Sequence, residues 1–356
     1  MRKTKPPSNP DQVSKILVLR LSHLGDVLLT IPLLKALDQI FRRAEISFCT
    51  RPEYIPLLSM VSAVDRAIAV LPEDLKSNKR ELVGRINQSG PYQLLLDLHD
   101  TPVTRTLRSA ISAERVLVSP KYTLERWLLV LVKKDLLPPQ WQVAERHLSL
   151  LQELGYDVEL NDYYLEIDKS VGKKLAGKHN IDLSSPPMAL APFATRPTKE
   201  WLAKYYVELA RLARSQWKTA MLILGSTAER ERGQALALEM QKNGLNAVSL
   251  AGELSLAELP HLLSQCAVLV GGDTGLVHLA GACGIPTLAI FGPTTTRLGF
   301  APLGDNSIAV GCELSCRPCS RHGGECCPLG TLECMEKLKP QEVYHLLSDL
   351  LTVAGK

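Results

Sequence analysis

A regular alternation of short apolar runs with helix-like segments constrains the fold of this chain more than any other feature. KILVLRL at 15–21 is followed by a helical stretch and then by a second strand-like run, AEISFCT at 44–50. Runs that are apolar throughout are typical of strands buried on both faces of a parallel sheet. Strand, helix and strand within about forty residues predict a βαβ unit.

The alternation continues for the length of the chain, with one interruption at about 168–187. Strands are predicted at 92–99 and 114–119 before it, and at 188–194, 218–226, 246–252, 267–273 and 285–292 after it, with helices between them. A chain of 356 residues is about two domains long. We therefore expect two α/β domains. The predicted division is a disordered lead-in at 1–14, an N-terminal domain at 15–170, a linker at 171–186, a C-terminal domain at 187–340 and a C-terminal helix at 341–356.

Composition excludes several classes of protein. A net charge of +4 and an aromatic content of 5% argue against a nucleic-acid-binding protein, so no nucleic-acid partner is expected. The basic, proline-containing start of the chain lacks the apolar core of a secretory signal, and no apolar run approaches the roughly 20 residues that span a bilayer. We expect a cytoplasmic protein whose nine cysteines are mostly reduced thiols.

Four junctions between a strand and the next helix carry polar residues that folding alone does not require. Ligands of open α/β sheets bind beyond the carboxyl ends of the strands, where helix N-termini point their free N–H groups. The first junction is SHLGDV, in which Asp26 opens a helix. Asp26 is interpreted either as an N-cap or as a carboxylate placed to act as a general base.

The second and third junctions follow the first two strands of the C-terminal domain. APFATRPTKEW offers two hydroxyls and two cations at a helix start, which suits a phosphate: Thr195, Arg196, Thr198 and Lys199. The alternative is a solvated loop capped by Thr198. In LILGSTAERER, Glu229 could bond a ribose hydroxyl, or could simply complement the helix dipole.

The fourth junction, GGDTGLVH at 271–278, is the most specific. Asp273 and Thr274 can cap the following helix, and the N–H groups of Thr274 and Gly275 are placed to bind an anion. His278 lies one helical turn after Thr274. Capping explains one of these residues but not the whole set, so the junction predicts a diphosphate site.

Taken in this order, the junctions resemble the ADP-heptose:lipopolysaccharide heptosyltransferases of glycosyltransferase family 9. The resemblance covers nearly the whole chain, and GDVLLTIP, KEW, GGDTGLVHLAGACGIPTLAIFGPT and the Cys-rich segment carry it most specifically. It implies a GT-B fold: two Rossmann-like domains facing across a cleft, the first binding the acceptor and the second the nucleotide sugar. It also implies inverting transfer of heptose from ADP-heptose to the inner core of lipopolysaccharide, without metal or other cofactor.

The resemblance assigns roles residue by residue. Asp26 matches the catalytic base, and Lys199 matches a lysine that contacts the donor phosphates and assists catalysis. His23 departs from the usual small residue before the early GD and is an extra polar group on the acceptor side. The residues implied in donor binding are Thr195, Lys199, Glu229, Asp273, Thr274, Gly275 and His278.

Alternatives remain for the reaction and for the state of the enzyme. One alternative is a transferase of the same fold that uses another nucleotide sugar. Another is a nucleotide-sugar 2-epimerase, which needs no acceptor site, so that Asp26 would be dispensable for its donor chemistry. We expect a monomer that binds ADP-heptose or a related nucleotide sugar and a lipopolysaccharide core acceptor. Contact with the cytoplasmic face of the inner membrane is a further option.

Two further segments have more than one interpretation. Six cysteines at 312, 316, 319, 326, 327 and 334 contain a single C-x2-C pair, so a structural metal and reduced buried thiols are both considered. Leu124, Trp127, Leu128 and Leu131 are spaced i, i+3, i+4, i+7. This spacing is typical of a helix facing the protein core, and the alternative is a helix lying on an anionic membrane surface.

Overall fold

The computed structural model describes residues 10–355 except 140 and 218, and the chain divides into two compact units. The first comprises Met1–Lys121 and Gln142–Glu166, and the second comprises Tyr122–Trp141 and Ile167–Lys356. The chain thus enters the second unit at 122–141 before returning to the first, whereas the sequence suggested a single crossing near residue 170. Of the predicted disordered lead-in, 1–9 lies outside the described residues, and Val13 at its end is buried.

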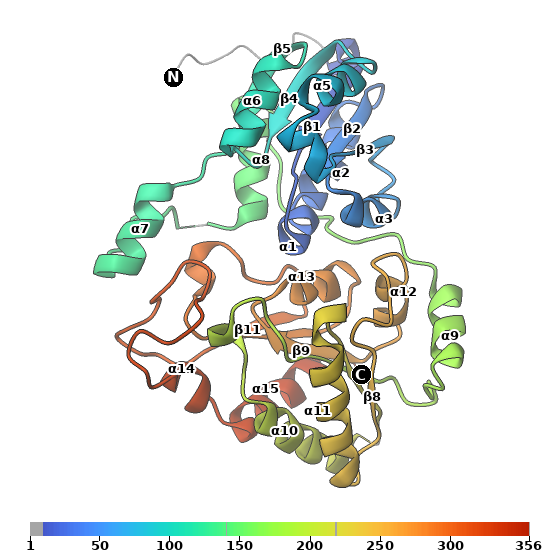
Figure 1. Cartoon of the computed structure of the whole chain (residues 1–356), viewed down its shortest axis with the longest axis vertical. Coiled ribbons are helices and arrows are strands. Elements are labelled where there is room, and N and C mark those ends of the chain that lie inside the picture. The colour runs from blue at the N-terminus through green and yellow to red at the C-terminus, as the bar shows by residue number, and fades with distance from the viewer. Residues whose placement is uncertain (1–9, 140, 218, 356) are drawn as a thin grey trace. The chain divides into compact units, whose positions relative to one another are not determined.

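The first unit is built on a five-stranded parallel sheet in the order β3-β2-β1-β4-β5 (Figure 1). Its strands are β1 (Lys15–Leu19), β2 (Glu45–Thr50), β3 (Arg66–Ala69), β4 (Tyr92–Asp97) and β5 (Ala113–Val118). Its helices and 3-10 turns are η1 (Pro10–Gln12), α1 (Leu24–Leu28), α2 (Ile31–Ile40), η2 (Pro52–Tyr54), α3 (Ile55–Leu58), α4 (Pro72–Lys76), α5 (Lys79–Asn87), α6 (Pro102–Ala110) and α8 (Val143–Glu153).

The second unit repeats this plan with one more strand, in the order β11-β10-β9-β6-β7-β8, again all parallel. Its strands are β6 (Met188–Ala191), β7 (Met221–Ile223), β8 (Ala247–Ser249), β9 (Val268–Gly272), β10 (Thr287–Ile290) and β11 (Ser307–Val310). Its helices and turns are α7 (Thr123–Val132), α9 (Lys169–Lys178), η3 (Pro197–Lys199), α10 (Ala203–Gln216), η4 (Thr227–Glu229), α11 (Arg230–Lys242), α12 (Leu259–Leu263), α13 (Gly275–Ala282), η5 (Thr296–Leu298), α14 (Glu333–Glu336) and α15 (Pro340–Val353).

The strand order of each sheet reverses direction at one place. In the first unit the reversal lies between β1 and β4, and in the second between β6 and β9. At such a switch point the loops that follow the two strands leave in opposite directions and open a crevice at the carboxyl ends of the strands. The predicted class, two Rossmann-like α/β domains with parallel sheets, is confirmed.

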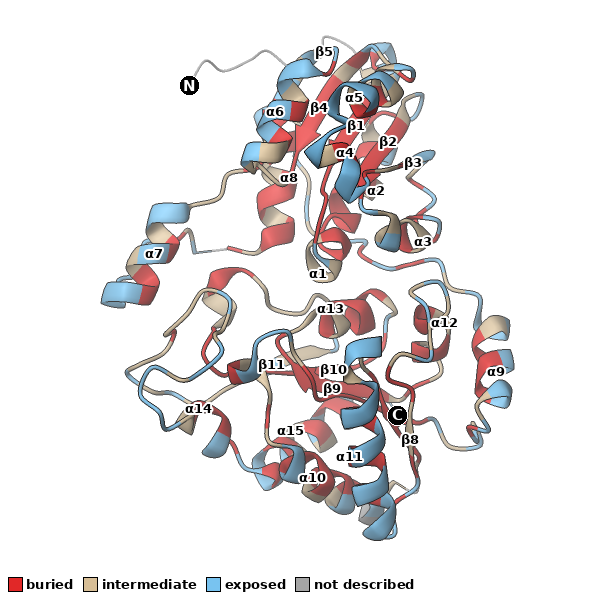
Figure 2. Cartoon of the chain, in the orientation of Figure 1, coloured by how far each residue is buried: buried red, intermediate tan, exposed pale blue. Residues whose placement is uncertain are grey.

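The central strands are apolar throughout because helices cover both faces of each sheet. All residues of β6, β9 and β10 are buried, and so are the last four residues of β1 (Figure 2). The second unit's core includes Trp201, Tyr206 and Met335, which bring α10 and the end of the chain onto the sheet. Trp201 also donates its indole N–H to the carbonyl of Leu338 at 3.0 Å, so burying this large side chain leaves no donor unpaired.

Helix α7 differs from its predicted environment. Leu124, Trp127 and Leu131 are exposed by 68%, 42% and 67%, whereas Leu129 and Val130 on the other side of the helix are buried. The interpretation of the stripe as core-facing is therefore wrong for Leu124, Trp127 and Leu131, whereas the fourth stripe residue, Leu128, is half-buried. Its spacing correctly indicated an apolar helix face, but spacing carries no information about which surface that face meets.

Helix α9 covers the first half of the predicted linker, 171–178, and packs on α12. A Cβ at Gly172 would lie 2.1 Å from the carbonyl oxygen of His261, so only glycine fits at this contact. Gly177, in the same helix, has no neighbouring atom within 4 Å of its virtual Cβ. Substituting alanine at Gly172 therefore tests close packing, whereas substituting alanine at Gly177 tests helix propensity alone.

We expect Gly172→Ala to destabilise the protein by about 1–3 kcal/mol, because α9 must move away from α12. Gly177→Ala should instead stabilise it by roughly 0.5–1 kcal/mol, since alanine favours the helix and meets nothing. The midpoints of thermal unfolding of the two variants test this. Equal shifts of the same sign would contradict the packing described here.

Candidate functional site

Lys199 and Asp273 meet at the switch point of the second sheet. The ends of β6 and β9 are paired there, with Ala191 opposite Gly271. Lys199 lies in η3 after β6, Asp273 follows β9, and the distance from Nζ to Oδ2 is 2.9 Å. The same carboxylate oxygen accepts a 2.8 Å hydrogen bond from the hydroxyl of Thr294, which follows β10. Three loops are thus joined through one carboxylate.

The two glycines that end β9 are needed by this junction. A Cβ at Gly271 would lie 2.7 Å from the Cβ of Ala191, and one at Gly272 would lie 2.6 Å from the carbonyl oxygen of Lys199. At these two glycines the backbone of β9 lies close to other parts of the same chain, at Ala191 and Lys199. They allow η3 to lie directly against the end of β9, which brings Lys199 to Asp273.

Helix α13 begins immediately after this ion pair. Thr274 occupies its N-cap position, but its side chain makes no capping hydrogen bond. Its hydroxyl oxygen is buried and has no hydrogen-bond partner among the described residues. The capping interpretations of Asp273 and Thr274 are therefore wrong. Gly275 starts the helix, and His278 is buried one turn later. The amide of Val277 bonds the carbonyl of Thr274 at 3.3 Å. The amides of Gly275 and Leu276 precede the first intrahelical bond and lie at the positive end of the helix dipole.

The Cys-rich segment supports Lys199 from the other side. Gly323 has a φ of +80°, and a Cβ on it would lie 2.8 Å from Cγ and 2.9 Å from Cδ of Lys199. Thr198 exchanges two hydrogen bonds with the backbone of Gly324, at 2.8 and 2.9 Å. The stem of Lys199 is therefore held between η3 and residues 323–324.

Arg317 holds the loop that follows β10. Its guanidinium donates to the carbonyl oxygens of Phe291, Gly292, Thr294 and Cys312, and burial lowers its pKa. An arginine that binds four carbonyls fixes the backbone around Thr294. Arg317 therefore acts on the Lys199–Asp273 pair indirectly, through the hydroxyl of Thr294.

The cysteines of the described chain do not come together as a metal site. All nine cysteines are free, and no three His, Cys, Asp or Glu side chains in the part of the chain that the structure describes come together as metal ligands. Cys334 is buried in the second unit's core beside Met335. The alternative of a structural metal thus finds no ligand set here.

Two other predicted donor residues form no hydrogen bond or ion pair with Lys199 or Asp273 among the described contacts. Thr195 is exposed, and its neighbour Arg196 pairs with Glu325 at 2.5 Å. Oε2 of Glu229 accepts from the N–H of Ser226 at 2.6 Å and from its hydroxyl at 2.8 Å. These bonds form a capping box at the start of η4. The contacts of Glu229 in this structure therefore fit its interpretation as a helix-start residue.

The switch point of the first sheet carries a second ion pair. Nη2 of Arg20 lies 2.6 Å from Oδ2 of Asp26, and both side chains are largely buried. Arg20 also donates to the carbonyls of Ser22 and Leu98, which ties the loop after β1 to the loop after β4. Asp26 is not the N-cap that one interpretation made it, because His23 occupies that position and donates its N–H to Asp26 Oδ2 at 3.3 Å. The imidazole of His23 is exposed.

The charge of Asp26 is set by its neighbours. Burial raises the pKa of this carboxyl, but the opposing effects of the Arg20 guanidinium and of hydrogen bonds from His23 are larger together, and they hold the pKa far below its usual range. Asp26 is therefore ionised at neutral pH. Its carboxylate is partly accessible, with 15% of the side chain exposed.

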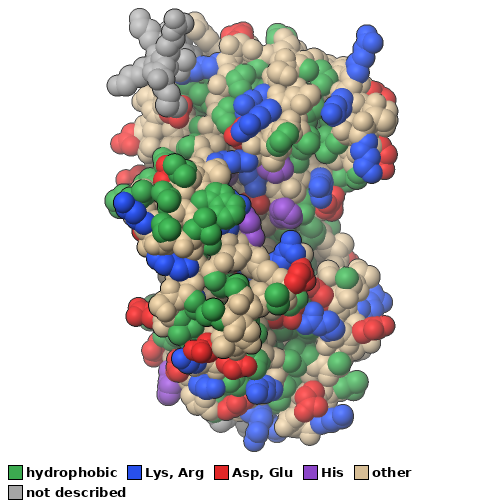
Figure 3. Space-filling model, turned by 60° about the vertical axis from the view of Figure 1, so that its left-hand side comes forward, with side chains coloured by type: hydrophobic (Ala, Val, Ile, Leu, Met, Phe, Trp, Pro, Cys, Tyr) green, Lys and Arg blue, Asp and Glu red, His purple; other side chains and the backbone are tan. Residues whose placement is uncertain are grey.

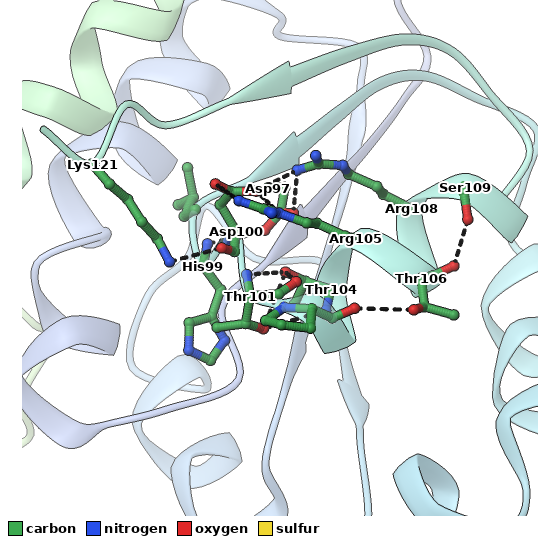
Figure 4. A network of polar contacts seen from close by, with 12 residues as sticks. Asp97, His99, Asp100, Thr101, Thr104, Arg105, Thr106, Arg108, Ser109 and Lys121 are labelled. Carbon is green, nitrogen blue, oxygen red and sulfur yellow. Dashed lines mark hydrogen bonds and ion pairs between the residues drawn. The ribbon is translucent and has the colours of Figure 1, made fainter. Parts of the chain in front are cut away.

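The end of β4 contributes a network that was not singled out from the sequence (Figure 4). Asp97 is fully buried and pairs with Arg108 at 2.8 Å, and its other oxygen accepts from the N–H groups of His99 and Asp100. Arg105 bonds both oxygens of Asp100 at 2.9 Å. Lys121 donates to the carbonyl of Asp100 at 2.7 Å. The rule that selected the other four junctions applies to DLHD as well and could have found this one.

His99 projects away from this network, as Figure 4 shows. Burial and the nearby Arg20 charge lower its pKa to about 4, so the imidazole is neutral at pH 7. Its Nδ1 is buried and has no hydrogen-bond partner among the residues described. A neutral imidazole beside the Arg20–Asp26 pair can donate to or accept from a substrate hydroxyl.

The comparisons with known proteins decide the family. The model of glycosyltransferase family 9 (heptosyltransferase) matches residues 90–327. The chain belongs to glycosyltransferase family 9. This family 9 chain is 26% identical over 319 residues to "Lipopolysaccharide heptosyltransferase 1" of Pseudomonas aeruginosa, and the match covers 86% of each protein.

Solved structures show the same fold. The structure of Escherichia coli ADP-heptose lipopolysaccharide heptosyltransferase II is 21% identical, with a TM-score of 0.76, and the match covers 96% of this chain and all of that one. The structure of E. coli heptosyltransferase WaaC with ADP-2-deoxy-2-fluoro heptose is 20% identical, with a TM-score of 0.68, covering 94% and 99%. This glycosyltransferase thus has the GT-B fold that the sequence predicted. The family whose model it matches is one of glycosyltransferases, which argues against the nucleotide-sugar 2-epimerase.

We expect Arg20→Met to raise the pKa of Asp26 above the ordinary aspartate value of about 3.9, because burial would then act unopposed by the guanidinium. In the native protein, the stability that this lowered pKa contributes is fully present above the unfolded-state pKa of about 3.9 and is lost as the pH falls. In the variant the sign reverses, and stability is lost as the pH rises through the raised pKa. NMR titration of 13C-labelled aspartate carboxyls measures the pKa of Asp26 in the native protein and in the variant.

Arg105→Met is the matched control, since that guanidinium pairs with Asp100 and not with Asp26. It should leave the titration of Asp26 unchanged. If Asp26 titrates alike in the Arg20 variant and in the native protein, Arg20 is not what sets its charge.

Proposed function

We propose that this enzyme transfers heptose from ADP-heptose to a sugar of the lipopolysaccharide inner core, with inversion at the anomeric carbon and without a metal ion. The observation that carries this proposal is the Lys199–Asp273 pair beside the N-terminus of α13. The names of the family and of the relatives support heptose as the sugar and lipopolysaccharide as the acceptor.

The donor diphosphate would lie at the carboxyl ends of β6 and β9. An ammonium group has three N–H donors, and Asp273 uses one of those of Lys199, which leaves two for phosphate oxygens. Asp273 thus orients the lysine instead of binding phosphate itself, since two anions would repel. The first-turn amides of α13 and the hydroxyl of Thr274 supply further donors. We assign Thr195, Glu229, Gly275 and His278 to the remainder of the donor pocket.

The reaction needs charge compensation at the leaving group. The bond between the anomeric carbon and the β-phosphate oxygen breaks, its electron pair stays on ADP, and the acceptor oxygen bonds to the anomeric carbon. In many transferases a divalent cation meets the charge that grows on the diphosphate. Here Lys199 and the dipole of α13 would meet it, because they are fixed before the reaction and need no reorganisation.

Asp26 would take the proton from the attacking hydroxyl. A carboxylate with a lowered pKa is always ionised and available, although it is a weaker base than an ordinary aspartate. Asp26 would therefore promote the reaction mainly by its position and by its negative charge, which would stabilise the positive charge that develops on the anomeric carbon. His23 and the neutral His99 would bind acceptor hydroxyls near it.

Asp26→Asn should lower turnover by about 10²–10⁴-fold while leaving ADP affinity nearly unchanged, because the amide keeps the shape but cannot accept the proton. Initial rates with ADP-heptose and a heptose-deficient lipopolysaccharide acceptor measure the first quantity, and calorimetry with ADP measures the second. Asp38→Asn, an exposed carboxylate on α2, is the control and should keep full activity. Near-native turnover of Asp26→Asn would rule out the assignment.

Gly323→Ala should weaken ADP binding, because its Cβ displaces the stem of Lys199. The matched control is Gly330→Ala, which has a similar φ of +71° but no atom within 4 Å of the added Cβ. Both variants place alanine at a similar positive φ, so they differ in the contacts of the added Cβ, which at Gly323 meets Lys199 and, at 3.0 Å, the Cβ of Arg196.

Lys199→Ala gives the largest expected effect, with which the two glycine variants are compared. It should weaken ADP binding by about 10–100-fold, because a hydrogen bond between charged groups is lost. The account requires the order Lys199→Ala, then Gly323→Ala, then Gly330→Ala, from weakest to native binding by calorimetry. Equal affinities for the two glycine variants would show that the Cys-rich segment does not position the lysine.

A further inference from the structure

Helix α7 carries a concentration of exposed apolar side chains. Eleven large hydrophobic residues are exposed in the described part of the chain, and five of them lie within 124–136: Leu124, Trp127, Leu131, Val132 and Leu136. Figure 3 shows hydrophobic side chains gathered over this part of the molecule. We call these five residues the α7 patch.

The patch is presented rigidly, because the opposite face of α7 is anchored in the second unit. Leu129 and Val130 form a small core with Leu137, Trp141 and Leu298. Arg297 bonds both oxygens of Asp135, at 2.6 and 2.9 Å, and also the carbonyls of Leu137, Pro138 and Pro139. The exposure of the patch is therefore a property of a well-packed helix, not of a loose one.

Cations border the patch. Lys133 donates to the carbonyls of Val130, Cys316 and Pro318. Lys134 is exposed and forms no ion pair with a described residue. The guanidinium of Arg321 stacks over the ring of Trp127, 4.2 Å from its centroid. Asp135, the acid nearest these cations in sequence, is paired with Arg297.

We propose that the α7 patch docks this enzyme on an anionic membrane surface. An interfacial helix combines apolar side chains that enter the acyl boundary with cations at the headgroups, and tryptophan favours that level of the bilayer. Lysine and arginine close to such a surface are attracted by anionic lipids. Among the described residues no helix is long and apolar enough to cross a membrane, so the contact is one that lies on the surface.

A second copy of this chain fits the patch less well. A symmetric dimer through α7 would place the patch against itself and bring Lys133, Lys134 and Arg321 of each copy near those of the other. Like charges brought together in this way oppose association. An anionic lipid surface satisfies both the apolar side chains and their cationic border. The proposal concerns binding alone and stands whether or not the proposed transfer reaction is correct.

Co-sedimentation of the full chain with lipid vesicles tests this proposal. Wild-type protein should bind vesicles of phosphatidylethanolamine and phosphatidylglycerol, bind vesicles of phosphatidylcholine alone more weakly, and lose affinity as salt is added. The combined variant Leu124→Ser, Trp127→Ser, Leu131→Ser should bind the anionic vesicles about tenfold or more weakly, since three apolar anchors are removed.

Two controls separate docking from general effects. Leu238→Ser removes a side chain of similar exposure, 57%, from α11 and should bind vesicles like the wild type. Lys134→Glu keeps the apolar face and should weaken binding to anionic vesicles only. Thermal melts verify that each variant is folded, which is expected because all the substituted side chains are exposed.

Fluorescence gives a second readout. Vesicles with brominated acyl chains should quench part of the tryptophan emission of the wild type, and Trp127→Phe should remove that quenching while retaining binding. The proposal is overturned if wild-type protein does not bind anionic vesicles or if the triple variant binds them equally well. It is also overturned if the triple variant abolishes a concentration-dependent dimer and leaves vesicle binding unchanged, because the patch would then be a contact between copies.

Discussion

The reversal of strand order in each sheet is the constraint on which the Arg20–Asp26 pair of the first unit and the Lys199–Asp273 pair of the second unit depend. Parallel strands must be joined by crossovers, and where the order reverses, the loops after two neighbouring strands diverge. In the first sheet this occurs between β1 and β4, where Arg20 joins the two loops. In the second it occurs between β6 and β9, where Lys199 and Asp273 do the same. Polar side chains can gather at these two places without interrupting a core.

Each of these ion pairs fixes a functional group at a cost in desolvation. Burying two charges is expensive, and the attraction between them offsets that cost only with good geometry and additional hydrogen bonds. Arg20 meets this condition through two carbonyls, and Asp273 meets it through Thr294. The pairs are better understood as devices that orient Asp26 and Lys199 than as sources of stability. Arg317 and Gly323 extend that support to the Cys-rich segment, whose sequence suggested a metal.

The sequence predicted the central strands well because burial on both faces forces them to be apolar throughout. It did not reveal β3 and β11, which lie at sheet edges and are mostly half-buried or exposed, so they lack a continuous apolar run. The junctions at Asp26, Lys199 and Asp273 were found by their position after strands. That Lys199 bonds Asp273 could not be predicted, because the contact depends on how closely η3 approaches Gly272.

Helix α7 and the end of β4 show two other limits of the sequence. The spacing of Leu124, Trp127 and Leu131 identifies an apolar face but not the surface that covers it, and here nothing in the described chain buries it. At the end of β4, Asp97, Arg105 and Arg108 resemble ordinary surface charges in the sequence. Their pairing emerges only when α6 folds back over the loop.

The central claim is that the donor nucleotide binds at the switch point of the second sheet, and hydrogen–deuterium exchange with and without ADP tests it most directly. The amides of Gly275 and Leu276, at the start of α13, precede the first intrahelical bond and should exchange quickly in the free enzyme. The account predicts that ADP slows exchange in peptides covering 194–200 and 272–278 and leaves 20–26 unchanged. Protection centred on 20–26, or none at 272–278 at saturating ADP, would contradict it.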